Sequence, residues 1–335
     1  MNQVQFWEFV HENLLAGDPL MLLLVVESGG SSPGRPGFKM AVTPGGDRGG
    51  TIGGGAAEKD AVEQAQALLA RGTGRPRLLK LLHREGPPAG KRATARPSGG
   101  ICSGWQRVAL LMLAGGDSGA VDSLLFALRR NRPGRLLVSP QGLEFRPGRR
   151  SVPGGAFRLG AGSDWTYAEE TGLRPTLTIV GGGHVGLALS RLMAGLDFHV
   201  RVLDDREDLA TLEENTFAQE KHVVSYRHVG RLVEEGEQSY AVIMTHGHLD
   251  DERVLRQLAG KKLRYLGLLG SAAKNARLFA GLARKGVSRR ALERVHAPVG
   301  LPIHSHTPEE IAVSIAAEII SIKNQPKLQK VTSDK

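Results

Sequence analysis

The sequence predicts an α/β protein of two domains, an α+β domain followed by one built on a doubly wound parallel sheet. Three observations predict this fold. The chain has 335 residues, more than a single hydrophobic core usually organises. From Leu177 onward, short apolar strands alternate with helices, which is the pattern of parallel βαβ units. The first of those strands runs directly into a glycine-rich turn and then a helix.

The first domain is expected to span residues 1–150 and to mix helices with strands. Its expected helices are 3–16, 56–70 and 120–129, and its expected strands are 20–26, 38–42, 78–82 and 108–113. Two glycine-rich segments, 27–37 and 45–55, lie on either side of the second of these strands. Clustered glycines indicate tight backbone turns of the kind that approach a ligand closely.

The boundary between the domains is expected near residues 150–173. Residues 131–172 are rich in Gly, Pro and Arg with little periodicity, so 151–172 is interpreted as a linker. The second domain then spans 173–323 and is followed by a flexible polar tail at 324–335.

The second domain is expected to alternate strands with helices. Its strands are expected at 178–180, 199–203, 241–244 and 265–269, and its helices at 184–196, 251–259, 272–285 and 308–322. The last helix has the clearest start signal, because Thr307 and Glu310 form a capping-box pattern around Pro308.

Charge and cysteine content narrow the class of protein. The formal net charge is +10, and arginines crowd at positions 129, 130, 132, 135, 146, 149 and 150. Such a surface is either simply solvated or attracts an acidic partner or an anionic cofactor. No interleaved aromatics or zinc spacing accompany the charge, so nucleic acid is not expected. One cysteine excludes an intramolecular disulfide, and no apolar run is long enough to span a membrane, so we expect a cytoplasmic protein.

The glycine-rich turn carries a dinucleotide fingerprint. Gly181, Gly183 and Gly186 follow an apolar strand and open a helix, where backbone N–H groups can approach a pyrophosphate. Asp204 ends the next strand, at the spacing expected for an acid that binds a ribose hydroxyl. The sequence therefore predicts a Rossmann-like domain with a dinucleotide site at these four residues.

A histidine-rich segment follows the strand at 241–244. His246, His248 and Asp250 have the spacing with which some metal-dependent hydrolases begin their metal site. Here the segment follows a strand of a Rossmann-like sheet, where open α/β sheets bind their ligands. We therefore expect these residues to face a ligand, with Lys274 as a further candidate, rather than to bind a metal.

Two features of the first domain leave alternatives open. Gly53, Gly54 and Gly55 precede a helix with Glu58 in its first turn, which suits either an anion-binding loop or ordinary helix capping. The lone Cys102 stands in a glycine-rich segment with arginines nearby. That setting favours an accessible thiolate, whereas a single cysteine is more often a small buried apolar residue.

Taken together, the motifs resemble those of the XdhC/CoxI family of accessory factors. They occur in the family's order along nearly the whole chain, at Glu27-Ser28, 30–34, Lys39-Met40, 50–55 with Glu58, 181–186, Thr245-His246 with Asp250, 267–271 with Lys274, 298–301 and 307–312. The chain departs from the family pattern at Ser103, where a glycine is usual after the cysteine, and at Ala272-Ala273, where arginines are usual.

The resemblance implies a function in the maturation of molybdenum enzymes. It implies transient binding of molybdenum cofactor (molybdopterin), help with its sulfuration, and delivery to a xanthine dehydrogenase or aldehyde oxidase-type apoenzyme. Cys102 is then a candidate molybdenum ligand, and Gly53, Gly54, Gly55 and Glu58 are candidate cofactor contacts.

The same resemblance implies the partners and the class of protein. The partners are the client enzyme, a cysteine desulfurase, a molybdenum cofactor nucleotidyltransferase and a second copy of the chain in a homodimer. We expect a chaperone or insertion factor rather than a stand-alone catalyst. The alternative is an NAD(P)-dependent oxidoreductase that uses the Rossmann-like domain.

Overall fold

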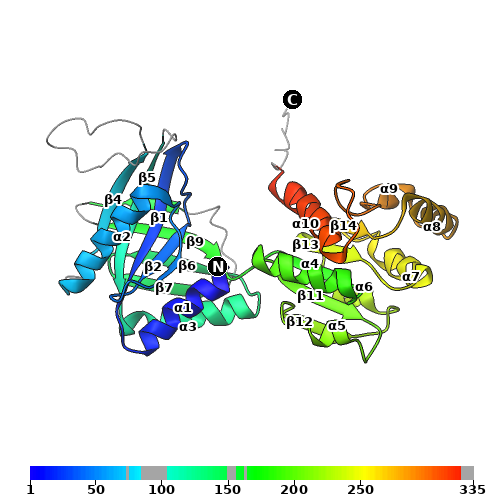
Figure 1. Ribbon diagram of the computed structural model, residues 1–335, viewed down its shortest axis with the longest axis horizontal. Coiled ribbons are helices and arrows are strands. Elements are labelled where there is room, and N and C mark those ends of the chain that lie inside the picture. The colour runs from blue at the N-terminus through cyan, green and yellow to red at the C-terminus, as the bar shows by residue number, and fades with distance from the viewer. Residues whose placement is uncertain (73–74, 84–103, 149–155, 162–163, 326–335) are drawn as a thin grey trace. The chain divides into compact units, whose positions relative to one another are not determined.

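A computed structural model describes residues 1–72, 75–83, 104–148, 156–161 and 164–325. The chain divides into two compact units, Met1–Leu173 and Arg174–Lys335 (Figure 1). No helix within the described ranges is long and apolar enough to cross a membrane.

The first unit contains two antiparallel sheets. Its elements are α1 (Gln3–Leu15), β1 (Leu20–Gly30), β2 (Lys39–Val42), β3 (Arg48–Gly50), α2 (Gly55–Ala70), β4 (Arg77–His83), β5 (Gly104–Leu113), a 3-10 turn (Gly115–Asp117), α3 (Ser118–Arg129), β6 (Gly134–Ser139), β7 (Gly142–Pro147), β8 (Ala156–Leu159) and β9 (Trp165–Thr171). The strand orders are β3-β2-β1-β5-β4 and β7-β6-β9-β8.

The apolar side chains of strand β1 are buried on both faces of the first sheet. Its apolar run from Leu20 to Val26 is buried throughout. Alternate residues point to opposite faces of a strand, so Leu22 packs with α1, α3 and the second sheet, whereas Leu23 packs with α2. A continuous apolar run is the pattern expected for a strand buried on both faces.

The structure corrects the linker expected at 151–172. Within that segment β8 and β9 pair with each other, and β9 also pairs with β6. These strands belong to the first unit, which extends to Leu173. Periodicity failed as a signal here because β8 has no buried residue and β9 buries an irregular set.

The second unit is a parallel five-stranded sheet in the order β12-β11-β10-β13-β14. Its elements are β10 (Thr176–Val180), α4 (His184–Gly195), β11 (His199–Asp204), α5 (Ala210–Glu213), β12 (Glu220–Val223), α6 (Val229–Leu232), β13 (Gly236–Ile243), α7 (His248–Leu258), β14 (Leu263–Leu268), α8 (Ala272–Arg284), α9 (Arg289–Leu292) and α10 (Pro308–Asn324). The expected Rossmann-like, doubly wound sheet is confirmed.

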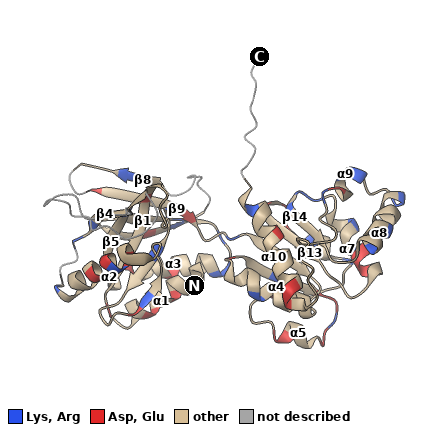
Figure 2. Ribbon diagram, turned by 45° about the horizontal axis from the view of Figure 1, so that its top comes forward, with Lys and Arg blue, Asp and Glu red and all other residues tan. Residues whose placement is uncertain are grey.

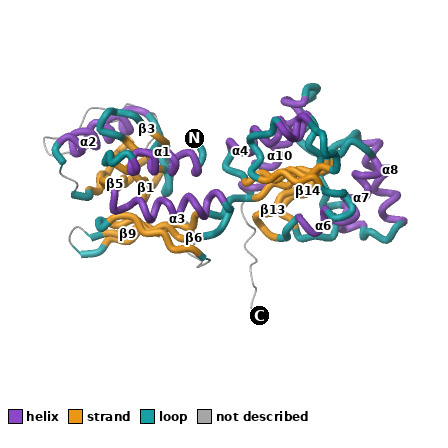
Figure 3. The backbone as a smooth tube through the Cα atoms, turned by 90° about the horizontal axis from the view of Figure 1, so that it is seen from below, coloured by secondary structure: helices purple, strands orange, loops and turns teal. Residues whose placement is uncertain are grey.

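Helices cover both faces of this sheet. One apolar cluster joins the sheet to α4 and α10, and the other joins it to α6, α7 and α8. Figure 3 shows β13 and β14 between these two layers. The last helix begins as the sequence predicts, because Thr307 Oγ1 accepts from the N–H of Glu310 while Glu310 caps the N–H of Thr307.

An ion-pair cluster ties β12 to the sheet. Glu220 accepts hydrogen bonds from Arg201 Nε at 2.6 Å and contacts His199 Nε2 at 2.7 Å. Burial opposes ionisation of Glu220, but the bonds from Arg201 and His199 outweigh it and lower its pKa to about 2. The sequence does not predict β12, because its Glu, Lys and His residues lack the apolar pattern of a strand.

Glu220→Gln is expected to lower the unfolding free energy by about 1–2 kcal/mol at pH 7, because Arg201 and His199 lose their charged partner. The folded-state pKa lies below the ordinary value of 4.5. The stabilisation is therefore complete above that value and is lost as the pH falls towards 2. Urea unfolding of both proteins from pH 7 to pH 2 checks this, and a difference that stays constant with pH would contradict it.

Candidate functional site

The glycine turn after β10 has two positions where the fold itself requires glycine. Gly181 has φ +117°, and a Cβ atom there would overlap the carbonyl oxygen of Met244. A Cβ atom at Gly186 would overlap the carbonyl oxygen of Gly181, so this glycine lets α4 pack closely against the turn. Packing and backbone geometry therefore explain why both residues are glycine, and no ligand is needed for that explanation.

Gly183 is different, because nothing in the fold requires a glycine there. A Cβ atom would meet no heavy atom within 4 Å, and the backbone is extended with φ −67°. Gly183 is the N-cap of α4, and no side chain caps that helix. An uncapped helix N-terminus facing open space is suited to a phosphate group, so Gly183 fits a nucleotide or another phosphorylated ligand.

Asp204 is at the end of β11 as expected, but its carboxylate is engaged by the protein. The side chain is 0% exposed and accepts hydrogen bonds from Gly182 N–H at 2.7 Å and from Arg206 Nε at 2.8 Å. Burial opposes ionisation, but these bonds outweigh it and lower the pKa of Asp204. In this structure Asp204 anchors the glycine turn, and Arg206 is the more exposed group of the pair.

A polar cluster lies beside this turn at the carboxyl ends of β13 and β14. Thr245 Oγ1 donates to Asp251 Oδ1 at 2.7 Å, and Lys274 Nζ donates to Asp251 Oδ2 at 2.8 Å. A Cβ atom at Gly181 would lie 3.1 Å from the Thr245 nitrogen, so the cluster and the turn adjoin. This is the switch point of the sheet, where chain connections leave in opposite directions and open α/β sheets bind their ligands.

Asp251 is the residue of this site that the sequence does not predict. The neighbouring Asp250, which the sequence predicts to face a ligand, forms an ion pair with Arg253 on the surface of α7. His246 is half-exposed with its Nε2 3.9 Å from Asp250, and His248 is the first residue of α7. Among the described residues, no three His, Cys, Asp or Glu side chains are grouped as a metal site.

In the first unit, the side chain of Glu58 occupies the candidate anion-binding loop at Gly53–Gly55. Its Oε2 accepts from Thr51 Oγ1 at 2.6 Å and from the N–H groups of Ile52 and Gly54 at 2.9 Å. Burial opposes ionisation, but these bonds outweigh it and lower the pKa of Glu58. Glu58 therefore takes the place of an external anion, and it does not fit a cofactor contact.

Gln106 joins the two glycine-rich loops of this unit. Its buried amide donates to the carbonyl of Ile52 at 3.0 Å and accepts from the N–H of Gly34 at 3.1 Å. Two residues earlier, Gly104 lies against the backbone of Ser31 and Ser32. The predicted molybdenum ligand Cys102 lies outside the described residues.

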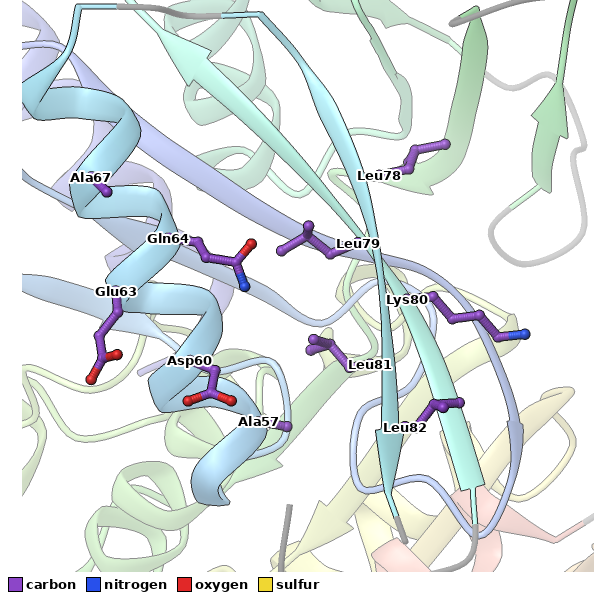
Figure 4. A pocket seen from close by; sticks show the side chains of 10 residues that line it. All are labelled: Ala57, Asp60, Glu63, Gln64, Ala67, Leu78, Leu79, Lys80, Leu81 and Leu82. Atoms are coloured by element: carbon purple, nitrogen blue, oxygen red, sulfur yellow. The ribbon is translucent and has the colours of Figure 1, made fainter. Parts of the chain in front are cut away.

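A groove in the first unit lies between α2 and the edge strand β4, with a volume of about 670 Å³. Figure 4 shows Leu79 and Leu81 pointing towards α2, where Asp60 and Glu63 line the groove. None of the expected site residues lines it. Two carboxylates against one ammonium, that of Lys80, make this groove a poorer site for a phosphorylated cofactor than the turn at Gly183.

Comparison with known proteins finds two family models that match parts of the chain. Residues 177–319 match the family model of the XdhC Rossmann domain, and residues 14–82 match that of the XdhC and CoxI family. The first match contains the glycine turn and the Thr245–Asp251–Lys274 cluster, and the second contains both glycine-rich loops.

Two curated proteins are similar to parts of the chain. The uncharacterized protein YqeB of Escherichia coli is 32% identical over 181 residues, which are 52% of this chain and 33% of that protein. A probable xanthine dehydrogenase subunit from Bacillus subtilis is 31% identical over 155 residues, which are 45% of this chain and 44% of that protein. The matched part is thus less than half the length of either relative.

The fold itself has a solved counterpart. A crystal structure of a xanthine dehydrogenase from Bacillus halodurans superposes with a TM-score of 0.74. The superposition covers 99% of this chain and 98% of that one at 23% sequence identity. Because the identity is this low, the superposition shows that the fold is shared and shows nothing about function.

Proposed function

We propose that this chain, which belongs to the XdhC and CoxI family, is an accessory factor for a xanthine dehydrogenase or aldehyde oxidase-type apoenzyme. It binds molybdenum cofactor transiently, assists its sulfuration and delivers it to that client. The observation that carries the proposal is the presence of both family regions in one chain. The name of the Bacillus subtilis relative, a probable xanthine dehydrogenase subunit, supports the choice of client.

Residues of both units have a part in this proposal. The open turn at Gly183 fits a phosphate, which pyridine nucleotides and molybdopterin both carry. Cys102 supplies the soft thiolate that suits molybdenum or its labile sulfur. Gly54 and Gly55 have positive φ angles and no heavy atom within 4 Å of a Cβ position, which supports a ligand approaching them although Glu58 holds the N–H of Gly54.

The partners follow from the proposed chemistry. A cysteine desulfurase supplies the sulfur, and a molybdenum cofactor nucleotidyltransferase supplies the cofactor. The chain acts as a homodimer in the cytoplasm and protects and presents the cofactor rather than turning over a substrate.

A second candidate function is an NAD(P)-dependent oxidoreductase. The contact that favours it is the Lys274–Asp251 pair next to the glycine turn, because a lysine ammonium can donate a proton to a substrate that accepts a hydride. Oxidation of NADPH by the purified protein when a small carbonyl compound is supplied as the hydride acceptor, without a client enzyme, would favour this candidate.

The proposal is tested by reconstitution. Apo xanthine dehydrogenase is incubated with molybdenum cofactor and a sulfur donor, with and without the purified chain. We expect the chain to raise the recovered client activity at least about tenfold, because a bound cofactor is protected from side reactions in water. Equal recovery with bovine serum albumin in its place would contradict the proposal.

A further inference from the structure

The Thr245–Asp251–Lys274 cluster has features that packing alone does not explain. Asp251 is only 1% exposed and ionisable, and burying a carboxylate is costly unless it is paired. It accepts from the backbone N–H and the hydroxyl of Thr245 and from the ammonium of Lys274. The buried carboxylate therefore fixes the position of Lys274.

The ammonium of Lys274 retains donor capacity towards the open side. A lysine ammonium has three N–H donors, and Asp251 is the partner that the structure describes for one of them. The Lys274 side chain is 39% exposed, so its head is held by the protein and still reaches solvent. A cation in this state can bind an anion without first being ordered.

A buried acceptor lies next to this cation. Asn275 is 2% exposed, and its Nδ2 donates to the carbonyl of Gly270 at 3.1 Å. Its Oδ1 is buried and has no hydrogen-bond donor among the described residues. Buried acceptors are rarely left unpaired, so a ligand or water is expected to supply the donor.

The surrounding charge favours an anionic ligand. Lys and Arg residues gather on α8 and α9 (Figure 2), at positions 274, 277, 284, 289 and 290. A surface of one sign of charge attracts ligands of the opposite sign over long range. Lys274 is the member of this group that the carboxylate of Asp251 holds at the edge of the sheet.

We propose that Lys274, held by the carboxylate of Asp251, which Thr245 in turn positions, is a cationic subsite that binds an anionic group of the ligand seated on the Gly181–Gly186 turn. The ligand class is a phosphorylated heterocycle, either a pyridine nucleotide or the pterin of molybdenum cofactor. This inference rests on the proposed ligand at the glycine turn and adds the residue that binds the anionic group of that ligand.

The competing role for Lys274 is a tie between helices α7 and α8. The chain offers a matched control for that role, because Lys285 follows α8 and pairs with Glu252 of α7. Both lysines join the same two helices, whereas Lys274 alone is at the carboxyl edge of the sheet beside Thr245.

The experiment compares Lys274→Met, Lys274→Arg and Lys285→Met with the wild type in the full chain. Affinities for NAD⁺, for NADP⁺ and for molybdopterin are measured by calorimetry or fluorescence, and melting temperatures are recorded alongside. We expect Lys274→Met to weaken binding of one of these ligands by about 10- to 100-fold, because a charge-assisted hydrogen bond is lost. Lys274→Arg retains the charge and should restore most of the affinity.

The results distinguish the two ligand classes, and they distinguish this inference from the proposed accessory function. A loss of affinity for nucleotides alone, or for molybdopterin alone, identifies which phosphorylated ligand Lys274 binds. Equal affinities for Lys274→Met and Lys285→Met, or no binding of any of the three by the wild type, would overturn the inference. Reconstitution of the client with the wild-type chain measures the accessory function separately, so a failure of the Lys274 inference and a failure of the accessory function give different results.

Discussion

Gly183→Val is expected to weaken ligand binding at the glycine turn by at least about 100-fold while leaving the fold intact. The added side chain would point into the open space at the N-terminus of α4, where the ligand phosphate is proposed to lie. The backbone at Gly183 is already in a region that valine adopts readily. Calorimetric titration with NADP⁺, beside a thermal melt, measures both effects.

Gly181→Ala is the matched control, because it alters the same turn with the opposite result. Its Cβ atom would overlap Met244 at a φ of +117°, so the fold should lose about 2–4 kcal/mol. If Gly183→Val melted as early as Gly181→Ala, or bound ligand as the wild type does, the turn would be a packing feature without a phosphate site.

Cys102→Ser is expected to lower the retention of molybdenum cofactor by at least about tenfold, because a hydroxyl is a poorer ligand for molybdenum than a thiolate is. The change in side-chain volume is small, so the melting temperature should stay near that of the wild type. Activation of the client should fall with retention, whereas NADP⁺ binding in the other unit should not change. A folded Cys102→Ser protein that retains cofactor and activates the client normally would leave Cys102 without a role in the site.

The sequence was a good guide where one short segment determines the geometry. The turn from Gly181 to Gly186 and the capping box at Thr307 and Glu310 are formed as their motifs predict. Each depends on contacts between residues close together in the chain, or on a backbone angle that only glycine adopts easily. Strand β1 was also clear, because burial on both faces leaves a continuous apolar run.

The sequence was a poor guide where the partner of a side chain is set by the fold. Asp250 and Asp251 are neighbours in the chain, but one faces Arg253 and the other is buried against Thr245 and Lys274. About 100° of helix rotation separates the two positions, and the apolar spacing of Val254, Leu255 and Leu258 indicates that Asp251 lies on the buried face of α7, although it does not indicate the partner. The spacing of Asp204 likewise gave no sign that Arg206 would take up its carboxylate.

The most direct test of the central claim is the molybdopterin content of the chain itself. The protein is expressed in cells that make molybdenum cofactor and purified under reducing conditions without oxygen, and its molybdopterin is quantified against protein. The proposed function predicts bound molybdopterin approaching one per chain, which is transferred when apo client is added. Protein that carries no molybdopterin, and takes none up when the cofactor is supplied, would contradict the proposed function.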